Sequence, residues 1–188
     1  MGYSAITSQA LSAPPYLASF IAVLITATLS DRAKSRSTFI MLHSLLAGSG
    51  YAMLVICGIF KLPVVVRYFA LYPACMGFFS IVTLVLTWTV NNHESDSGKG
   101  TGLTILGVIG QCGPLLGVQL FPDKDQPYYI RGMATCAGFM LFVGILAGIL
   151  RIVLQRENRM RLRKYNSERI GVDDEDEEMT AKPFLFII

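Results

Sequence analysis

The sequence predicts an all-α integral membrane protein, a polytopic bundle of about five transmembrane helices. Of its 188 residues, 53% are hydrophobic and only 15% are charged, and the mean hydropathy is +0.51. Soluble domains carry a larger charged fraction, about 25% of their residues. Apolar runs close to the ~20 residues that cross ~30 Å of hydrocarbon as a helix recur along the chain. An ordinary water-soluble fold is therefore not expected.

Polar segments divide the chain into five apolar runs. The breaks read SDRAKSRS, KLP, NNHESDSGKG and PDKDQP, which are typical of loops. Because the bilayer core offers no water to backbone groups, each run is expected to be helical, even the β-branched residues 64–66. Residues 1–154 are thus predicted to form the membrane domain. The expected spans are about 14–30, 39–60, 64–90, 102–121 and 129–154.

The basic residues predict how these spans are oriented. If the loop after the first span lies inside, 12 of the 16 Lys and Arg residues fall on that side. Cytoplasmic loops carry such an excess, so we expect a multi-pass protein of the plasma membrane with a cytoplasmic carboxyl terminus. The first residues lack the basic region of a signal peptide, so the first span is expected to direct its own insertion.

Residues 155–188 are predicted to form a cytoplasmic tail. The basic segment 155–169 is expected to continue the last helix, with arginines beside anionic lipid. The acidic run 173–178 has too little apolar surface to order itself and is expected to be solvated and flexible. Residues 184–188 are apolar but too short to span the bilayer, which leaves contact with the membrane or a partner.

Small residues predict where the helices approach one another closely. Residues 47–50 read AGSG, and two further pairs have the GxxxG spacing that lets membrane helices pack backbone to backbone. These pairs are Gly113 with Gly117 and Gly144 with Gly148.

Titratable groups are nearly absent from the expected spans. Charged side chains at mid-bilayer depth are costly and usually mark ion or proton pathways. Only His43 comes close, about one turn inside the second run. A lone histidine there is expected at the membrane interface rather than in a proton relay. The sequence therefore argues against an autonomous proton-coupled pump.

No set of residues predicts catalysis, a cofactor or a metal site. There is no His/Asp/Glu cluster, no Ser-His-Asp set and no metal-ligand spacing, so we expect a protein that is not an enzyme. Basic residues do not gather on one face, which argues against nucleic acid as a partner. The four cysteines are expected to be small buried hydrophobes. They are Cys57, Cys75, Cys112 and Cys136.

The first loop holds Asp31, Arg32 and Arg36 between two helices. Two interpretations stay open. The loop could be only a cytoplasmic charge cluster that obeys the positive-inside rule. Alternatively, Asp31 could pair with the N-terminus of the neighbouring helix, whose unpaired N–H groups carry partial positive charge.

The order of several motifs resembles one family of membrane transporters. The loop SDRAKSR at residues 30–36 resembles the segment that links the eighth and ninth helices of the major facilitator superfamily. The order around it is similar to the fungal allantoate permease group of anion:cation symporters. The superfamily loop usually has glycines where this chain has Ala27 and Lys34. The other motifs are LSAPPY (11–16), VRYFAL (66–71), LVLTWTVNN (84–92), IGQCGPLLG (109–117) and QLFPDKDQPYYIRG (119–132).

This resemblance implies a function and a partial fold. The five spans match the eighth to twelfth helices, part of the C-terminal half of such transporters, whose substrate site lies between two halves. The resemblance implies secondary transport of a small polar or anionic organic solute by a truncated chain that cannot transport alone and needs the missing half or another transporter chain. The alternative is a structural or regulatory membrane subunit that pairs with a fuller transporter.

Polar residues at membrane depth are the candidates for lining the solute pathway. Gln111 can donate and accept hydrogen bonds, although it could equally join two helices. Trp88 at a span end could instead be an anchor at the bilayer interface. The candidates are Thr83, Thr87, Trp88 and Asn91 on the third run and Thr104 and Gln111 on the fourth.

Overall fold

The computed structural model describes residues 5–169 and 183–188, and this part of the chain is helical with no strand. Five stretches are long and apolar enough to cross a membrane, which confirms the predicted fold class. The elements are α1 (Ala5–Ala33), α2 (Arg36–Ile59), α3 (Val64–Asn91), α4 (Asp96–Gly110), α5 (Gly113–Leu120), a 3-10 turn (Asp123–Asp125) and α6 (Ile130–Arg169). Helices α4 and α5 together form the fourth span.

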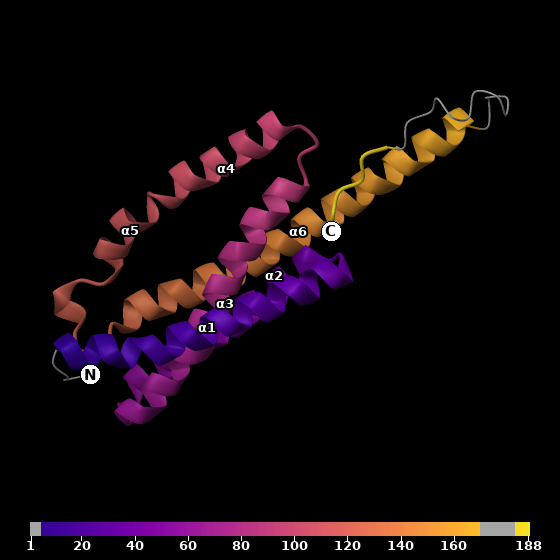
Figure 1. Cartoon of the computed structure of the whole chain (residues 1–188). Helices are drawn as coiled ribbons and strands as arrows, with labels where there is room; N and C mark the ends of the chain where they lie inside the picture. The colour runs from indigo at the N-terminus through magenta and orange to yellow at the C-terminus, as the bar shows by residue number, and fades with distance from the viewer. Residues whose placement is uncertain (1–4, 170–182) are drawn as a thin grey trace.

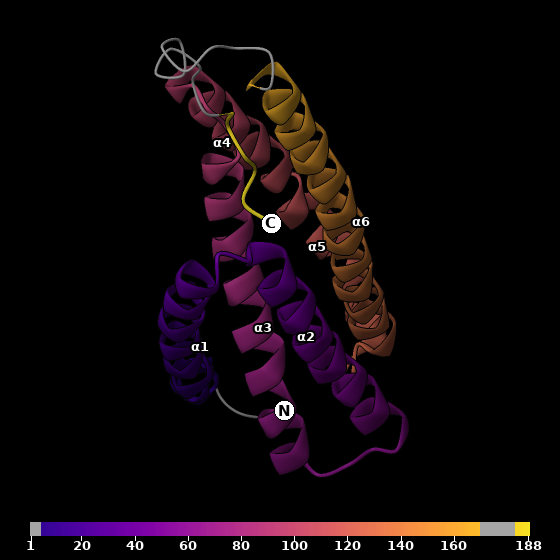
Figure 2. The ribbon, with the colours of Figure 1, turned by 90° about the vertical axis from the view of Figure 1, so that its right-hand side faces the viewer.

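Four helices pack side by side. Helix α3 packs against both α1 and α2, and α2 also packs against α6, as Figures 1 and 2 show. At Gly77 an added Cβ would lie 2.6 Å from both the Ala47 nitrogen and the His43 oxygen. At Gly144 it would collide with the Ser44 Oγ. Close packing at the AGSG stretch and at Gly144 is therefore confirmed.

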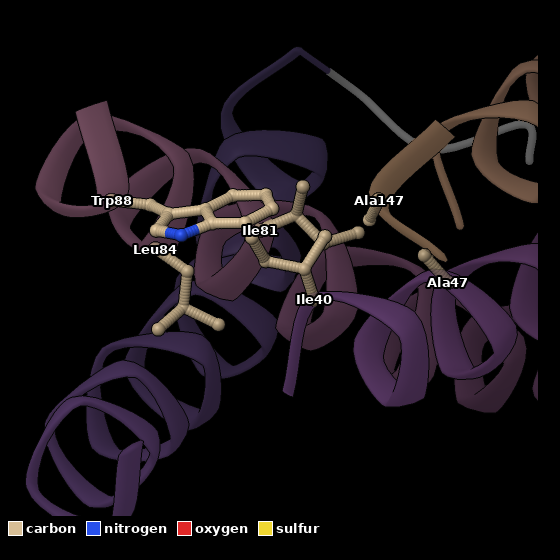
Figure 3. Packing of buried hydrophobic residues seen from close by; sticks show 6 residues of the cluster. All are labelled: Ile40, Ala47, Ile81, Leu84, Trp88 and Ala147. Atoms are coloured by element: carbon tan, nitrogen blue, oxygen red, sulfur yellow. The ribbon is translucent and has the colours of Figure 1, made fainter. Parts of the chain in front are cut away.

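The apolar core is small and lies where α2, α3 and α6 meet. Few large side chains are buried there, and many of those on the outside of the bundle are exposed, such as Leu17 and Ile149. Hydrocarbon is the solvent that such an outer surface fits. Figure 3 shows the core residues: Ile81, Leu84 and Trp88 of α3, Ile40 and Ala47 of α2, and Ala147 of α6.

Helices α4 and α5 stand apart from this bundle (Figure 1). Their most apolar stretch has no buried residue, and an added Cβ at Gly113 or Gly117 would meet nothing within 4 Å in the described chain. The predicted close packing of this GxxxG pair is thus not seen. Cys112 is exposed at the break between the two helices, while Cys75 and Cys136 are only partly buried. The prediction of buried cysteines is correct only for Cys57.

Helix α1 begins well before the first apolar run and passes through Pro14 and Pro15. Proline removes a helical hydrogen-bond donor, and the Leu11 carbonyl oxygen, which faces Pro15 in the helix, accepts from the Tyr68 hydroxyl of α3 at 3.0 Å instead. Helix α6 continues past residue 154 to Arg169, so the basic segment is helical. The acidic run 173–178 lies outside the described residues.

Candidate functional site

A pocket of about 220 Å³ lies between α1 and α3. Three of its α1 residues follow Tyr16 at three, four and seven positions, which puts all four on one face of that helix. The rings of Tyr16 and Phe79 meet edge to face across the pocket, with centroids 5.6 Å apart. The lining residues are Tyr16, Ser19, Phe20 and Val23 of α1 and Phe79 and Thr83 of α3.

The pocket combines aromatic rings with hydroxyl groups and has no charged lining residue. The Thr83 Oγ1 donates to the Phe79 carbonyl oxygen at 3.1 Å, as Ser19 does to Pro15 at 2.8 Å. Both hydroxyls keep lone pairs that can accept further hydrogen bonds. Pockets for drug-sized ligands are roughly 300–1,000 Å³, so this space suits a single-ring solute or part of a larger one.

Of the candidate lining residues, only Thr83 lies in this pocket. Thr87 is one turn further along α3, where its hydroxyl donates to the Thr83 carbonyl oxygen at 2.8 Å. Trp88 is in the core, 6% exposed. Thr104 and Gln111 are exposed on the separate α4–α5 span. The predicted lining residues therefore do not form one site: Thr83 lines the pocket, Trp88 belongs to the core, and Thr104 and Gln111 lie on the exposed span.

The four α1 residues of the pocket, Tyr16, Ser19, Phe20 and Val23, were not among the predicted lining residues. Their spacing along one helical face was a signal that could have found them. The spacing does not show which helix this face meets. In the structure α1 packs beside α3, which places the face next to Thr83.

The loop motif forms a second candidate site, a hydrogen-bonded cluster of Asp31, Arg36 and Asn91 that is called the Arg36 clasp below. The Arg36 Nη2 donates to the Asp31 Oδ1 at 2.6 Å, and Arg36 is only 8% exposed. With its amide oxygen turned toward the guanidinium, Asn91 accepts from the Arg36 Nε at 2.9 Å and Nη2 at 2.8 Å. Asp31 thus pairs with a side chain at the first residue of α2 rather than with main-chain N–H groups. Arg32 is exposed. The clasp joins the ends of α1, α2 and α3.

Lys34 lies in the turn between Asp31 and Arg36 and has a φ of 47°. This left-handed conformation is the one that glycine adopts without steric cost. The resemblance to the superfamily loop leads to an expectation of glycine at this position, and the chain has the left-handed turn with lysine in its place.

His43 is a link between helices. It is 8% exposed and so lies inside the bundle, while its depth at the membrane interface stays a prediction. Its Nδ1 lies 2.8 Å from the Phe39 carbonyl oxygen and its Nε2 lies 3.0 Å from the Thr26 Oγ1. A carbonyl only accepts, so Nδ1 carries a hydrogen and donates to Phe39. Both ring nitrogens thus have hydrogen-bond partners, and the Thr26 contact joins α2 to α1.

Fold and site together define a helical membrane protein with an uncharged, solute-sized pocket. No protein-family model and no solved structure matches the chain. Among curated proteins, it is 30% identical to the high-affinity nicotinic acid transporter of Saccharomyces cerevisiae over 158 residues, which are 84% of this chain and 29% of that protein. It is 26% identical to an uncharacterized transporter of Schizosaccharomyces pombe over 188 residues, which are 100% of this chain and 38% of that protein.

A third relative is an MFS-type transporter of Penicillium expansum, 24% identical over 198 residues that cover 100% of this chain and 38% of that protein. The chain thus spans about a third of the length of the curated relatives it matches. Similarity to MFS-type transporters extends over most of the chain, which supports the predicted resemblance to the major facilitator superfamily. The relatives named here are transporters rather than enzymes.

Proposed function

We propose that this chain forms one wall of a secondary transporter of the major facilitator type, similar to the fungal allantoate permease group, and that the complete transporter moves a small polar or anionic organic solute. The observation that carries the proposal is the uncharged pocket between α1 and α3. Ser19 is near the middle of α1 by position, which fits a site near the bilayer midplane, where such transporters bind their substrates.

The lining favours a ring that carries a hydrogen-bonding group. Tyr16, Phe20 and Phe79 offer aromatic faces and edges. The oxygens of Ser19 and Thr83 can accept from an amide N–H, and either hydroxyl can donate to a carboxylate if it turns away from its main-chain carbonyl. Nicotinic acid, named as the substrate of the Saccharomyces relative, combines an aromatic ring with a carboxylate. No lining residue carries a positive charge. In this proposal, positive charge on the other group of transporter helices, across the pathway, balances the charge of an anion.

The uncovered α4–α5 span supports a second wall beyond this chain. Its apolar faces lack any buried residue within the described structure, and alternating access needs two groups of helices that rock against each other. In this proposal residues 1–154 are the membrane domain of a plasma-membrane protein and residues 155–188 are its cytoplasmic tail. The missing helices come from a longer polypeptide or from another transporter chain.

A chimera tests the proposal. The matching segment of the Saccharomyces nicotinic acid transporter is replaced by this chain, and uptake of labelled nicotinic acid and a panel of small organic anions is measured in cells that lack their own transporter. We expect uptake by the chimera and none by the chain alone. Thr83→Val, which removes the hydroxyl at nearly constant volume, should lower uptake about tenfold, the effect of ~1.4 kcal/mol.

Thr28→Val is the matched control, because Thr28 is exposed on α1 and outside the pocket, and its hydroxyl likewise donates to the carbonyl four residues back, that of Leu24. Equal losses for both variants would reject the pocket as the solute site. Uptake by the chain alone would reject the single wall. A chimera that reaches the surface and moves no solute, beside a chain that changes the uptake of an intact co-expressed transporter, would favour the regulatory subunit.

A further inference from the structure

Residues 183–188 lie as an extended segment against the C-terminal end of α3 and the part of α6 around Asn158, shown in yellow in Figures 1 and 2. Two asparagine side chains hold its backbone. Asn92, the residue after α3, donates to the Ile187 carbonyl oxygen at 3.2 Å and accepts from the Ile187 nitrogen at 2.8 Å. Asn158 of α6 makes the same pair of bonds to Phe186, both at 2.8 Å. Each amide therefore bonds both main-chain groups of one residue.

The two bonded residues are consecutive, which is what an extended peptide between two walls requires. Main-chain groups of neighbouring residues in an extended chain point to opposite sides. Phe186 therefore bonds toward α6 while Ile187 bonds toward α3. Side-chain amides placed in this way bind the main chain of an extended peptide through hydrogen bonds, as peptide-binding domains do at a sheet edge.

Further contacts add specificity for this segment. The Trp88 Nε1 donates to the Ile187 carbonyl oxygen at 2.7 Å. The Arg161 Nη1 donates to the Phe184 carbonyl oxygen at 3.2 Å, and its guanidinium lies 4.5 Å from the centre of the Phe186 ring. A guanidinium over an aromatic face is attractive. The site thus fits an apolar peptide with an aromatic residue at the position of Phe186.

We propose that the C-terminal end of α3 and the part of α6 around Asn158 form a binding site for an extended apolar peptide, and that residues 183–188 occupy it as a latch inside the same chain. Along the bundle α2 lies between α3 and α6, and the segment connects those two helices. Its anchor, Trp88, belongs to the core where the helices meet. The docked segment therefore fixes α3 relative to α6 at the end of the bundle that also carries the Arg36 clasp.

The latch acts on transport by restricting the movement of α3, a step that rests on the proposed function. Pocket residues Phe79 and Thr83 are on α3, and Trp88 follows on the same helix. Alternating access moves helices at one end of the pathway apart. The latched state holds this end closed, and release of the segment allows it to open.

Trp88 is the only tryptophan of the chain, so its fluorescence reports docking directly. The chain is compared in lipid nanodiscs with a variant that lacks residues 183–188, after circular dichroism has shown equal helicity. We expect red-shifted emission and stronger acrylamide quenching in the truncated chain. Unchanged emission and quenching would overturn the docked site.

Adding a synthetic peptide of residues 170–188 to the truncated chain should restore the blue-shifted emission. A peptide with residues 183–188 in scrambled order has the same tendency to enter lipid and should not restore it. Asn158→Ala should weaken binding of the native peptide about thirtyfold, since it removes two hydrogen bonds of ~1 kcal/mol each. Asn166→Ala, an exposed asparagine two turns further along α6, is the matched control. Equal restoration by both peptides would show only lipid partitioning and reject the site.

The latch role is tested in the transport chimera described above. Removal of residues 183–188 and Asn158→Ala should both raise the rate of uptake, while Asn166→Ala should not. Unchanged uptake beside a clear change in Trp88 fluorescence would reject the latch and leave a packed segment. If no variant takes up solute while Trp88 still responds to the peptide, the proposed function fails and the binding site stands.

Discussion

The Tyr68 hydroxyl of α3 donates a hydrogen bond to the Leu11 carbonyl oxygen of α1 at 3.0 Å. In a regular helix this oxygen would accept from the nitrogen of residue 15, but residue 15 is proline and has no N–H. The side chain of one span therefore satisfies the backbone of another. This bond joins α1 to α3 away from the Arg36 clasp, near the opposite end of both helices.

Tyr68→Phe is expected to destabilise the chain by about 1 kcal/mol, because the Leu11 carbonyl loses its partner. The quantity to measure is the free energy of unfolding by SDS titration in mixed micelles. Tyr72→Phe removes only a 3.3 Å bond from Tyr72 to the Tyr68 hydroxyl and should cost less. A larger loss in Tyr72→Phe than in Tyr68→Phe would contradict this account of α1.

Arg36→Lys should destabilise the chain by roughly 2 kcal/mol in the same titration. Lysine cannot reproduce the fork that bonds Asp31 and Asn91 together, and hydrogen bonds to charged groups contribute about 1.5–3 kcal/mol. Arg32→Lys, at an exposed position in the same loop, is the control and should be nearly neutral.

Asn91→Ala should cost less than Arg36→Lys, because the bond from Arg36 to Asp31 remains. The double variant should fall short of the sum of the two single effects, as it does for residues in direct contact. Strict additivity would mean that Asn91 does not share the Arg36 clasp.

Lys34→Gly should stabilise the chain by about 0.5–1 kcal/mol. A non-glycine residue in the left-handed region costs roughly 1–2 kcal/mol, part of which is offset because glycine makes the unfolded chain more disordered. Lys34→Ala retains the Cβ and should show no such gain. A stabilisation as large in Lys34→Ala would show that removal of the lysine charge, rather than relief of the backbone, is responsible.

Gly77→Ala should destabilise the bundle by about 1–3 kcal/mol, the usual cost of overpacking. The added methyl group would lie 2.6 Å from backbone atoms of Ala47 and His43, where no flexible side chain can give way. Thermal unfolding followed by circular dichroism measures the loss.

Gly107→Ala is the informative comparison, since nothing lies within 4 Å of a Cβ at this position. In the isolated chain the change should be neutral or stabilise α4 by up to about 1 kcal/mol through helix propensity. In the transport chimera the same change should reduce uptake if α4 packs there against further helices. Equal tolerance in both settings would argue against a second wall at α4.

The candidate site was less predictable than the fold. Thr83 and Trp88 are five positions apart on one apolar run, yet Thr83 reaches a pocket and Trp88 a core. Helical periodicity separates their faces but does not say what each face meets. That depends on α1 and α2 packing on different sides of α3. Nothing local to Trp88 or Asn92 predicted that both would bond Ile187, 99 and 95 positions away.

By itself, the sequence determined that the chain is helical and crosses a membrane about five times, because hydrocarbon leaves backbone groups only helical partners and the apolar runs are long enough to span it. It also determined which residues were small enough for close contact, such as Gly144, and which loop carried the paired charges. Tertiary structure alone decided which of these groups meet. The contacts of Arg36 with Asn91, of Tyr68 with Leu11 and of residues 183–188 with α3 and α6 form only after the helices have packed. Each contact joins segments far apart in the sequence, and the local pattern of one segment does not predict its partner.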